Sequence, residues 1–421
     1  MNMVFRFLFT LLVLGSLLHA ITFRQISQMP KGPEKDYYIW RFISQPSTTP
    51  KEAMEVIRQA SNINKTLTNA YRAKTGQMPR LHSRGGVPAP PPPSQNDNKA
   101  KRYFKTGINA VDRGDLQHAL HHFGWANKLA SSQLVKDQSA FWLYLLTHDK
   151  MYLKQLLKSN DPNLYTLVAQ DLVGGKYPQT ITQKFPKRTV SHFNIKNPID
   201  WAHLKRRLFS PKTNLEKLAK EYESEYTQGP YTYIKAYASK YREHYFPIPY
   251  QDVLRYKTID RQALIYAIAR QESRFVPASV SRSFALGMMQ IMPFLVKDIS
   301  KKKGDNIDLD MMFDPYKAIE YADFHLDYLT SYLYHPLFVA YAYNGGIGFT
   351  RRLIERKDYF RQGPYEPYLS IEKLNNVEAR EYGKKVLVNY VIYRNKLGKP
   401  TRLLPLLKQL TYPAQTDRFR R

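Results

Sequence analysis

The chain has 421 residues, and 64 Lys and Arg stand against 35 Asp and Glu, which gives a formal net charge of +29. It contains no cysteine, so disulfides, thiolate metal sites and cysteine nucleophiles are excluded. A hydrophobic content of 43% excludes disorder along the whole chain, and the length predicts two or three domains. The positive charge favours a polyanionic partner without selecting among nucleic acid, an anionic membrane and an acidic polymer.

Residues 1–20 have the pattern of a secretory signal peptide. A single positive charge in residues 1–6 precedes a nearly apolar run at 7–18, and Ala20 is a small residue at a plausible cleavage site. The run is shorter than the roughly 20 residues of a membrane-spanning helix, so we interpret it as a cleaved signal rather than an uncleaved anchor. We therefore expect export to the periplasm, no transmembrane anchor after cleavage, and no nucleic acid as partner.

The region 21–250 is predicted to consist of short helices in series. Within 51–60, Ala53, Val56 and Ile57 follow one helical stripe. A proline-rich and glycine-rich segment at 85–98 is interpreted as a loop or linker.

The next helices, from 99 to about 250, have the spacing of stacked helix pairs. Ala119, Phe123 and Ala126 alternate small and large side chains, as in helical-repeat arrays. Such a stack forms a curved surface that can hold an extended partner.

Two groups of residues invite a metal-site interpretation. His118, His121 and His122 stand at helical spacing, but we find no acidic residue at matching spacing and interpret them as a solvated helix face. An acidic cluster resembles a calcium loop but lacks its central glycine and closing glutamate. Its members are Asp305, Asn306, Asp308, Asp310 and Asp314. Asp314 is better interpreted as the cap of a helix that starts at Pro315. We expect no metal and no cofactor.

Residues 246–250 are predicted to be a domain boundary, because two prolines interrupt the helical pattern there. A helix-rich domain follows at 251–400, and then a basic C-terminal tail at 401–421. The basic runs 301–303 and 418–421 are interpreted as solvated. Almost nothing in the chain alternates as a strand does, so the predicted fold class is all-α.

The strongest local pattern is a helix that starts near Asp260, the expected N-cap, and carries Glu272. Glu272 follows Leu264 and Ile268 at intervals of four residues, so it lies on their apolar face. A carboxylate there is costly unless it is paired or protonated, and burial raises its pKa, as a general acid requires. The alternative is that Glu272 simply ends the helix, with its carboxylate in solvent or on an arginine.

Further motifs follow Glu272 and Ser273 in order: Ser281, Gly-Met-Met-Gln-Ile-Met-Pro at 287–293, Ala-Tyr-Asn-Gly-Gly at 342–346, and Glu-Ala-Arg-Glu-Tyr at 378–382. Together they resemble the lytic transglycosylases of the soluble type, which have a goose-type-lysozyme-like fold. The resemblance covers residues 260–396, and the helical region before it is similar to the α-superhelical domain of that family. The departures from the family pattern are Phe284 for Gly, Met288 for Leu, Gly345 for Ala and Ala379 for Thr. Phe284 is the one that bears on the shape of its loop.

The resemblance implies cleavage of the β-1,4 bond between N-acetylmuramic acid and N-acetylglucosamine in peptidoglycan, with 1,6-anhydro ends. Glu272 is then the sole catalytic carboxylate, acting first as acid and then as base. The residues that the resemblance places along the glycan are Ser281, Gln290, Met292, Tyr343, Asn344 and Glu378. It also implies that Tyr343 and Asn344 orient Glu272 or the sugar, and that Ser273 and Tyr382 support the site. Met289 is interpreted as core packing.

Two alternatives remain: a muramidase on the same fold, which uses water, and a non-catalytic glycan-binding scaffold. The expected partner is peptidoglycan, with cell-wall synthases or amidases as further candidates. Nucleic-acid binding rests on charge alone.

Overall fold

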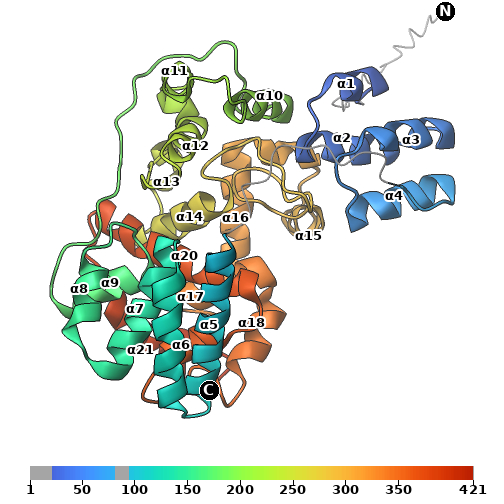
Figure 1. Cartoon of the computed structure of the whole chain (residues 1–421). Coiled ribbons are helices and arrows are strands. Elements are labelled where there is room, and N and C mark those ends of the chain that lie inside the picture. Colours follow the sequence, from blue (N-terminus) through green and yellow to red (C-terminus); the bar gives the residue numbers. More distant parts are fainter. Residues whose placement is uncertain (1–20, 81–93, 421) are drawn as a thin grey trace, which may run out of the picture. The chain divides into compact units, whose positions relative to one another are not determined.

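The computed structural model describes residues 21–80 and 94–420, and these residues form helices and isolated β-bridges without a strand (Figure 1). The predicted all-α class is thereby confirmed. The expected signal peptide, residues 1–20, lies outside the described residues, as does most of the expected loop at 85–98. Helix α5 (Gln95–Asp112) begins inside that segment, so the loop prediction is wrong for residues 95–98.

The described residues divide into two compact units. The first holds residues 21–80 and 282–284, and the second holds 94–281 and 285–420. No helix of these residues is both long and apolar enough to cross a membrane.

The first unit contains α1 (Phe23–Gln28), α2 (Pro33–Ile43), α3 (Pro50–Val56), the 3-10 turn η1 (Ile57–Gln59) and α4 (Lys65–Thr75). The predicted stripe is buried: Ala53 and Val56 are fully buried and Ile57 is 2% exposed. Phe284 belongs to this unit, with its ring stacked on Trp40 at 5.5 Å and edge-on to Tyr37 at 6.0 Å. Its φ of 67° is typical of glycine, so burial of the aromatic ring offsets the backbone strain of this departure from the family pattern.

The second unit starts with five helices in which each packs on the next: α5, α6 (Leu116–Leu129), α7 (Gln133–Thr147), α8 (Lys150–Leu157) and α9 (Leu164–Leu172). The small-large spacing has the predicted effect. Ala119, Phe123 and Ala126 are fully buried, and a Cβ added to Gly107 of α5 would come within 2.6 Å of the Phe123 ring. A glycine therefore lets α5 and α6 approach closely.

The histidines of α6 do not gather around a metal, since no metal-binding group of three or more His and acidic residues occurs among the described residues. The expectation that they have no acidic neighbour is wrong: Asp115 caps α6 and lies 2.6 Å from Nδ1 of His118. His121 accepts a hydrogen bond from Trp125 Nε1 at 3.1 Å.

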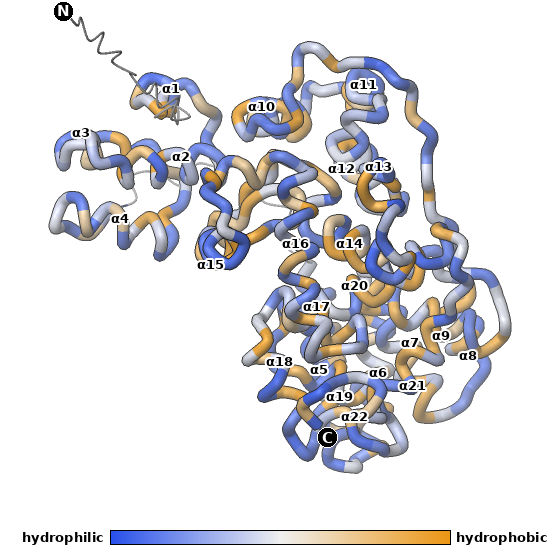
Figure 2. The backbone as a smooth tube through the Cα atoms, turned by 180° about the vertical axis from the view of Figure 1, so that it is seen from behind, coloured by the Kyte–Doolittle hydropathy of each residue, from blue (hydrophilic) through white to orange (hydrophobic). Residues whose placement is uncertain are grey.

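The remaining elements of the second unit are numerous. They are α10 (Pro198–Leu208), α11 (Leu215–Glu221), η2 (Glu225–Thr227), α12 (Gln228–Ala238), α13 (Gln251–Leu254), α14 (Ile259–Glu272), α15 (Pro293–Lys303), η3 (Leu309–Phe313), α16 (Pro315–Thr330), α17 (Pro336–Gly345), α18 (Ile347–Ile354), α19 (Tyr368–Lys373), α20 (Val377–Lys396), α21 (Leu403–Gln409) and α22 (Pro413–Thr416). Helix α14 packs on α20, which also packs on α17 and α9. The middle of α14 is hydrophobic (Figure 2).

Residues 246–250 do not separate two compact units, so the structure differs from the predicted boundary. Phe246 is fully buried and its ring lies 5.2 Å from that of Tyr393. The hydroxyl of Tyr266 donates to the Pro249 carbonyl at 2.6 Å, and that of Tyr393 donates to the Pro247 carbonyl at 3.0 Å. The prolines interrupt the helix but leave an extended segment that packs on α14 and α20. That residues 251–400 form a separate lysozyme-like domain stays a prediction.

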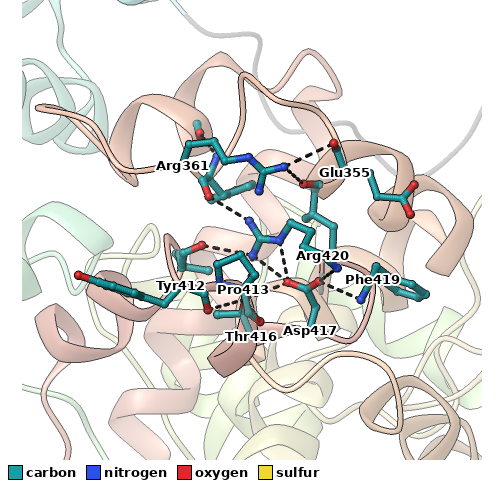
Figure 3. Close-up of polar contacts among 12 residues, drawn as sticks. Glu355, Arg361, Tyr412, Pro413, Thr416, Asp417, Phe419 and Arg420 are labelled. Atoms are coloured by element: carbon teal, nitrogen blue, oxygen red, sulfur yellow. Dashed lines mark hydrogen bonds and ion pairs between the residues drawn. The ribbon is translucent and has the colours of Figure 1, made fainter.

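The C-terminal residues are folded back rather than solvated (Figure 3). The side chain of Arg420 is 3% exposed and that of Asp417 is fully buried, and Arg420 Nη2 lies 2.8 Å from Asp417 Oδ2. Arg420 also donates to the Phe360 carbonyl at 2.9 Å. The expectation of a solvated end is therefore wrong for Arg420, because its guanidinium has a buried carboxylate and carbonyl oxygens as partners.

The N-cap of α14 is Thr258, not Asp260 as predicted: the Thr258 hydroxyl accepts from the Arg261 amide at 3.3 Å. Asp260 lies in the first turn and pairs with Arg394 and Lys399 at 3.0 and 2.9 Å. We expect Thr258→Ala to lower the free energy of unfolding by about 1 kcal/mol, measured by urea denaturation. Thr258→Asp should retain most of the stability, and an equal loss in both variants would contradict the assignment of this cap.

Candidate active site

The site is built around Glu272, the last residue of α14. Residues 263–269 of this helix are buried on all sides, with at most 6% exposure, so they anchor its C-terminal end. The Glu272 side chain is partly exposed, and its Oε1 accepts a hydrogen bond of 2.7 Å from the hydroxyl of Tyr382 on α20. Glu272 does end the helix, as the alternative interpretation has it, but the described partner of its carboxylate is the Tyr382 phenol and not an arginine.

The pKa of Glu272 is raised from 4.5 to about 7, mainly by burial, and the charge of Glu378 contributes in the same direction. The hydrogen bond from Tyr382 acts in the opposite direction, because it stabilises the carboxylate. Near neutral pH the group therefore exists in both protonation states, so it can give a proton and take one back.

A tight loop after α14 is tied to the end of that helix. The hydroxyl of Ser273 donates to the Met288 carbonyl at 2.7 Å and accepts from the Val276 amide at 3.2 Å. Gly287 has a φ of +74°, and a Cβ there would come within 1.9 Å of the Met312 carbonyl oxygen. Only glycine fits at this position, which explains the glycine of the sequence motif.

Gln290 braces the same loop, since its Nε2 donates to the carbonyls of Gly287 at 2.8 Å and Ser279 at 3.2 Å. Its amide oxygen makes no hydrogen bond within the described part of the chain. Met289 is fully buried, so the prediction of core packing is confirmed.

The hydroxyl of Tyr343 donates to the Met289 carbonyl at 2.8 Å and not to Glu272. The phenol that contacts Glu272 belongs to Tyr382, which was predicted only to support the site. The charge of Glu272 still acts on Tyr343: burial, and then this charge, holds the pKa of the Tyr343 phenol well above its usual value. Tyr343 thus positions the loop that follows α14.

Three other predicted residues have local partners. The hydroxyl of Ser281 accepts from the Ala285 amide at 2.9 Å, and Asn344 Nδ2 donates to Oε1 of the exposed Glu378 at 3.4 Å. Met292 is the N-cap of α15 and is partly exposed. Asn344 and Glu378 are brought together; neither makes a hydrogen bond to Glu272.

Two residues near the site were not identified from the sequence. The ring of His325 on α16 lies 5.8 Å from that of Tyr343, and burial lowers its pKa to about 4, so it is neutral at pH 7. Gly383 follows Tyr382, and a Cβ there would come within 2.2 Å of the Tyr341 ring on α17. A glycine inside a long helix was the available signal for this close approach.

We expect Tyr382→Phe to raise the pKa of Glu272 by about one unit above its value in the parent protein, because the variant loses a hydrogen bond to the carboxylate. Titration of the carboxyl group by infrared difference spectroscopy measures this shift. Tyr343→Phe is the matched control, since its hydroxyl bonds to a carbonyl. A pKa that stays the same or falls in Tyr382→Phe would contradict the assigned role of the hydroxyl.

The described part of the chain is all-helical and holds a partly exposed carboxyl group at the end of a core helix. Residues 254–363 match the model of the family described as "Transglycosylase SLT domain".

Two curated relatives show how far the similarity extends. "Soluble lytic murein transglycosylase" of Escherichia coli (strain K12) is 25% identical over 341 residues, which are 73% of this chain and 50% of that protein. "Membrane-bound lytic murein transglycosylase C" of Photorhabdus laumondii is 35% identical over 131 residues, which are 28% of this chain and 36% of that protein. The chain thus spans about half the length of the first of these relatives.

Solved structures show the same fold. The 70 kDa soluble lytic transglycosylase of Escherichia coli aligns with a TM-score of 0.54 and 18% identity, over 91% of this chain and 62% of that chain. An inactive mutant of lytic transglycosylase Slt from Pseudomonas aeruginosa aligns with a TM-score of 0.52 and 18% identity, over 90% and 66% of the two chains. The similarity therefore extends from the SLT domain into the helices before it.

Proposed function

We propose that the chain is a peptidoglycan lytic transglycosylase that cleaves the bond between N-acetylmuramic acid and N-acetylglucosamine and leaves 1,6-anhydro ends. The observation that carries the proposal is the half-buried Glu272, whose pKa is raised to about 7 at the end of a core helix. The SLT domain at 254–363 and the names of the relatives support the same substrate class.

Glu272 acts twice in the proposed reaction. Its protonated form gives a proton to the glycosidic oxygen as the bond from C1 of the muramic acid to that oxygen breaks, so N-acetylglucosamine leaves with a free 4-hydroxyl. The carboxylate then takes the proton of the 6-hydroxyl of the same muramic acid, whose oxygen attacks C1 and closes the 1,6-anhydro ring. No water is consumed, and Glu272 ends the cycle protonated.

Tyr382 serves both steps, because its hydrogen bond stabilises the carboxylate that exists between them. Glycosidases that add water use two carboxylates. In the proposed reaction the nucleophile is the 6-hydroxyl of the substrate itself. The acetamido group of the same sugar stabilises the positive charge at C1. The residues proposed to contact the glycan are Ser281, Gln290, Met292, Tyr343, Asn344 and Glu378.

The proposed location is the periplasm, where the basic surface of an exported chain concentrates it on an anionic wall polymer. Cell-wall synthases or amidases are proposed as further partners.

The test is digestion of purified sacculi followed by mass spectrometry of the released muropeptides. We expect 1,6-anhydro ends, which are lighter than reducing ends by one water. Reducing ends alone would assign the muramidase reaction and contradict the proposal. No release of muropeptides by the parent protein would favour the glycan-binding scaffold.

A further inference from the structure

A second site lies on another face of the two helices that hold Glu272 and Tyr382. It is a pocket of about 270 Å³ in the second unit. Its walls come from α14 and Arg274 in the turn after it, from α20, from Leu134 on α7, from the start of α9 and the residues just before it, and from residues 241–244. On α20, the residues that line it recur at intervals of three and four and so form one stripe of the helix, which excludes Tyr382. They are Glu381, Lys384, Lys385, Val388 and Asn389.

Three cations of this pocket have no carboxylate partner. Arg270, Arg274 and Lys385 line it, and none of them forms an ion pair within the described part of the chain. Arg270 donates only to the Tyr245 carbonyl at 2.8 Å and to Asn389 Oδ1 at 2.7 Å, and its Nη2 makes no hydrogen bond to the described residues. Arg274 lies over the Tyr241 ring at 5.2 Å and makes no hydrogen bond to them either.

The pocket also contains one paired lysine and three carboxylates, and among the described residues only Glu381 of these carboxylates has a cationic partner, because burial lowers the pKa of His244 beside Asp161. Lys384 contacts Glu372 and Glu381 at 3.1 and 3.0 Å, so it contributes no free charge. Asp161 lies 3.7 Å from His244, and the exposed Glu243 accepts a hydrogen bond of 2.6 Å from the Tyr245 hydroxyl.

The free cations also destabilise one another. The pKa of Arg270 is lowered to about 9, mainly by burial; the charge of Arg274 acts in the same direction, and Tyr393 and Asp161 act in the opposite one. The pKa of Lys385 is also lowered, mainly by desolvation of its ammonium group, and the charges of Arg274 and Lys384 lower it as well, whereas the charges of Glu381 and Asp161 act in the opposite direction. A pocket whose positive charges lack anions stabilises an anion that enters it.

We propose that this pocket binds a small phosphate or phosphoryl group. Two guanidinium groups and one ammonium group reach the same space from two helices and the turn after α14, so they can donate to different oxygens of a tetrahedral anion. The volume admits such a group. An occupant contacts α14 beside Glu272 and α20 beside Tyr382, and therefore ties together the two helices that carry this pair.

Isothermal titration of the full chain with inorganic phosphate at pH 7.5 and constant ionic strength tests the proposal. We expect saturable binding, about tenfold weaker in Arg274→Gln and in Lys385→Gln, because each variant loses a charge-assisted contact. Arg255→Gln is the matched control, since Arg255 also lies over a tyrosine ring, at 4.9 Å, but outside the pocket.

Lys385 is exposed, so its replacement tests the pocket even if Arg274→Gln does not fold. A phosphomonoester that binds more tightly than inorganic phosphate would identify a phosphorylated molecule as the ligand, and the reverse order would identify free phosphate. The absence of saturable binding, or equal weakening in Arg255→Gln, would overturn the proposal. These outcomes are independent of any cleavage of peptidoglycan.

Discussion

Glu272→Gln is expected to lower the release of muropeptides from sacculi by about 1000-fold or more. A general acid or base typically contributes a factor of about 10²–10⁴, and the same carboxyl group serves in both roles here. Glutamine keeps the size of the side chain and an oxygen that accepts from Tyr382, but it can neither give nor take the proton. Initial rates of muropeptide release measure the effect.

Glu355→Gln is the matched control for this experiment. Glu355 lies within 254–363, its side chain is 38% exposed, and it pairs with Arg351 at 2.8 Å on the surface. Its replacement should leave the rate unchanged. Equal rates in Glu272→Gln and the parent protein would contradict the role of Glu272.

The same variant has a second signature, in stability. The folded protein holds the proton of Glu272 up to about pH 7, whereas an unfolded glutamate releases it near 4.5. The parent protein therefore loses stability as the pH rises through this window, by about 3 kcal/mol at most, and Glu272→Gln does not. We expect the variant to be more stable than the parent at pH 8 and similar at pH 4. Thermal unfolding at both pH values also shows that lost activity is not due to unfolding.

Asp417→Asn is expected to lower the free energy of unfolding by about 3–5 kcal/mol, because it leaves the guanidinium of Arg420 buried without a carboxylate. The guanidinium lies over the ring of Phe338 at 5.4 Å, and Phe338 belongs to α17, the helix that carries Tyr343 and Asn344. The loss of this anchor should therefore also loosen α17. Urea denaturation of the full chain measures the effect.

Arg418→Ala is the control, since this exposed residue carries the same charge two positions away and lies over the Tyr332 ring at 5.7 Å. It should change the free energy of unfolding by no more than about 0.5 kcal/mol. Equal losses of stability in the two variants would contradict the assigned role of the buried pair.

The all-α class and the catalytic candidate were predictable, because both depend on the spacing of residues that are close together in the sequence. The spacing of Ala119, Phe123 and Ala126 sets which side of a helix is buried, and the spacing of Leu264, Ile268 and Glu272 places a carboxylate on an apolar face. The motifs that follow in order along 260–396 then predicted most of the residues that lie near Glu272.

Contacts between distant segments were decided only by the tertiary structure. The phenol that donates a hydrogen bond to Glu272 belongs to Tyr382, which lies 110 positions further along the chain. Tyr343, which stands in a more conspicuous motif, donates to the Met289 carbonyl instead. Arg420 stands in a basic run that resembles a solvated end, yet it is buried against Asp417. Periodicity reports which side of a helix is apolar but not which helix covers it. The partner of a polar group is determined by long-range packing, because its hydrogen bonds must be satisfied by whichever segment buries it.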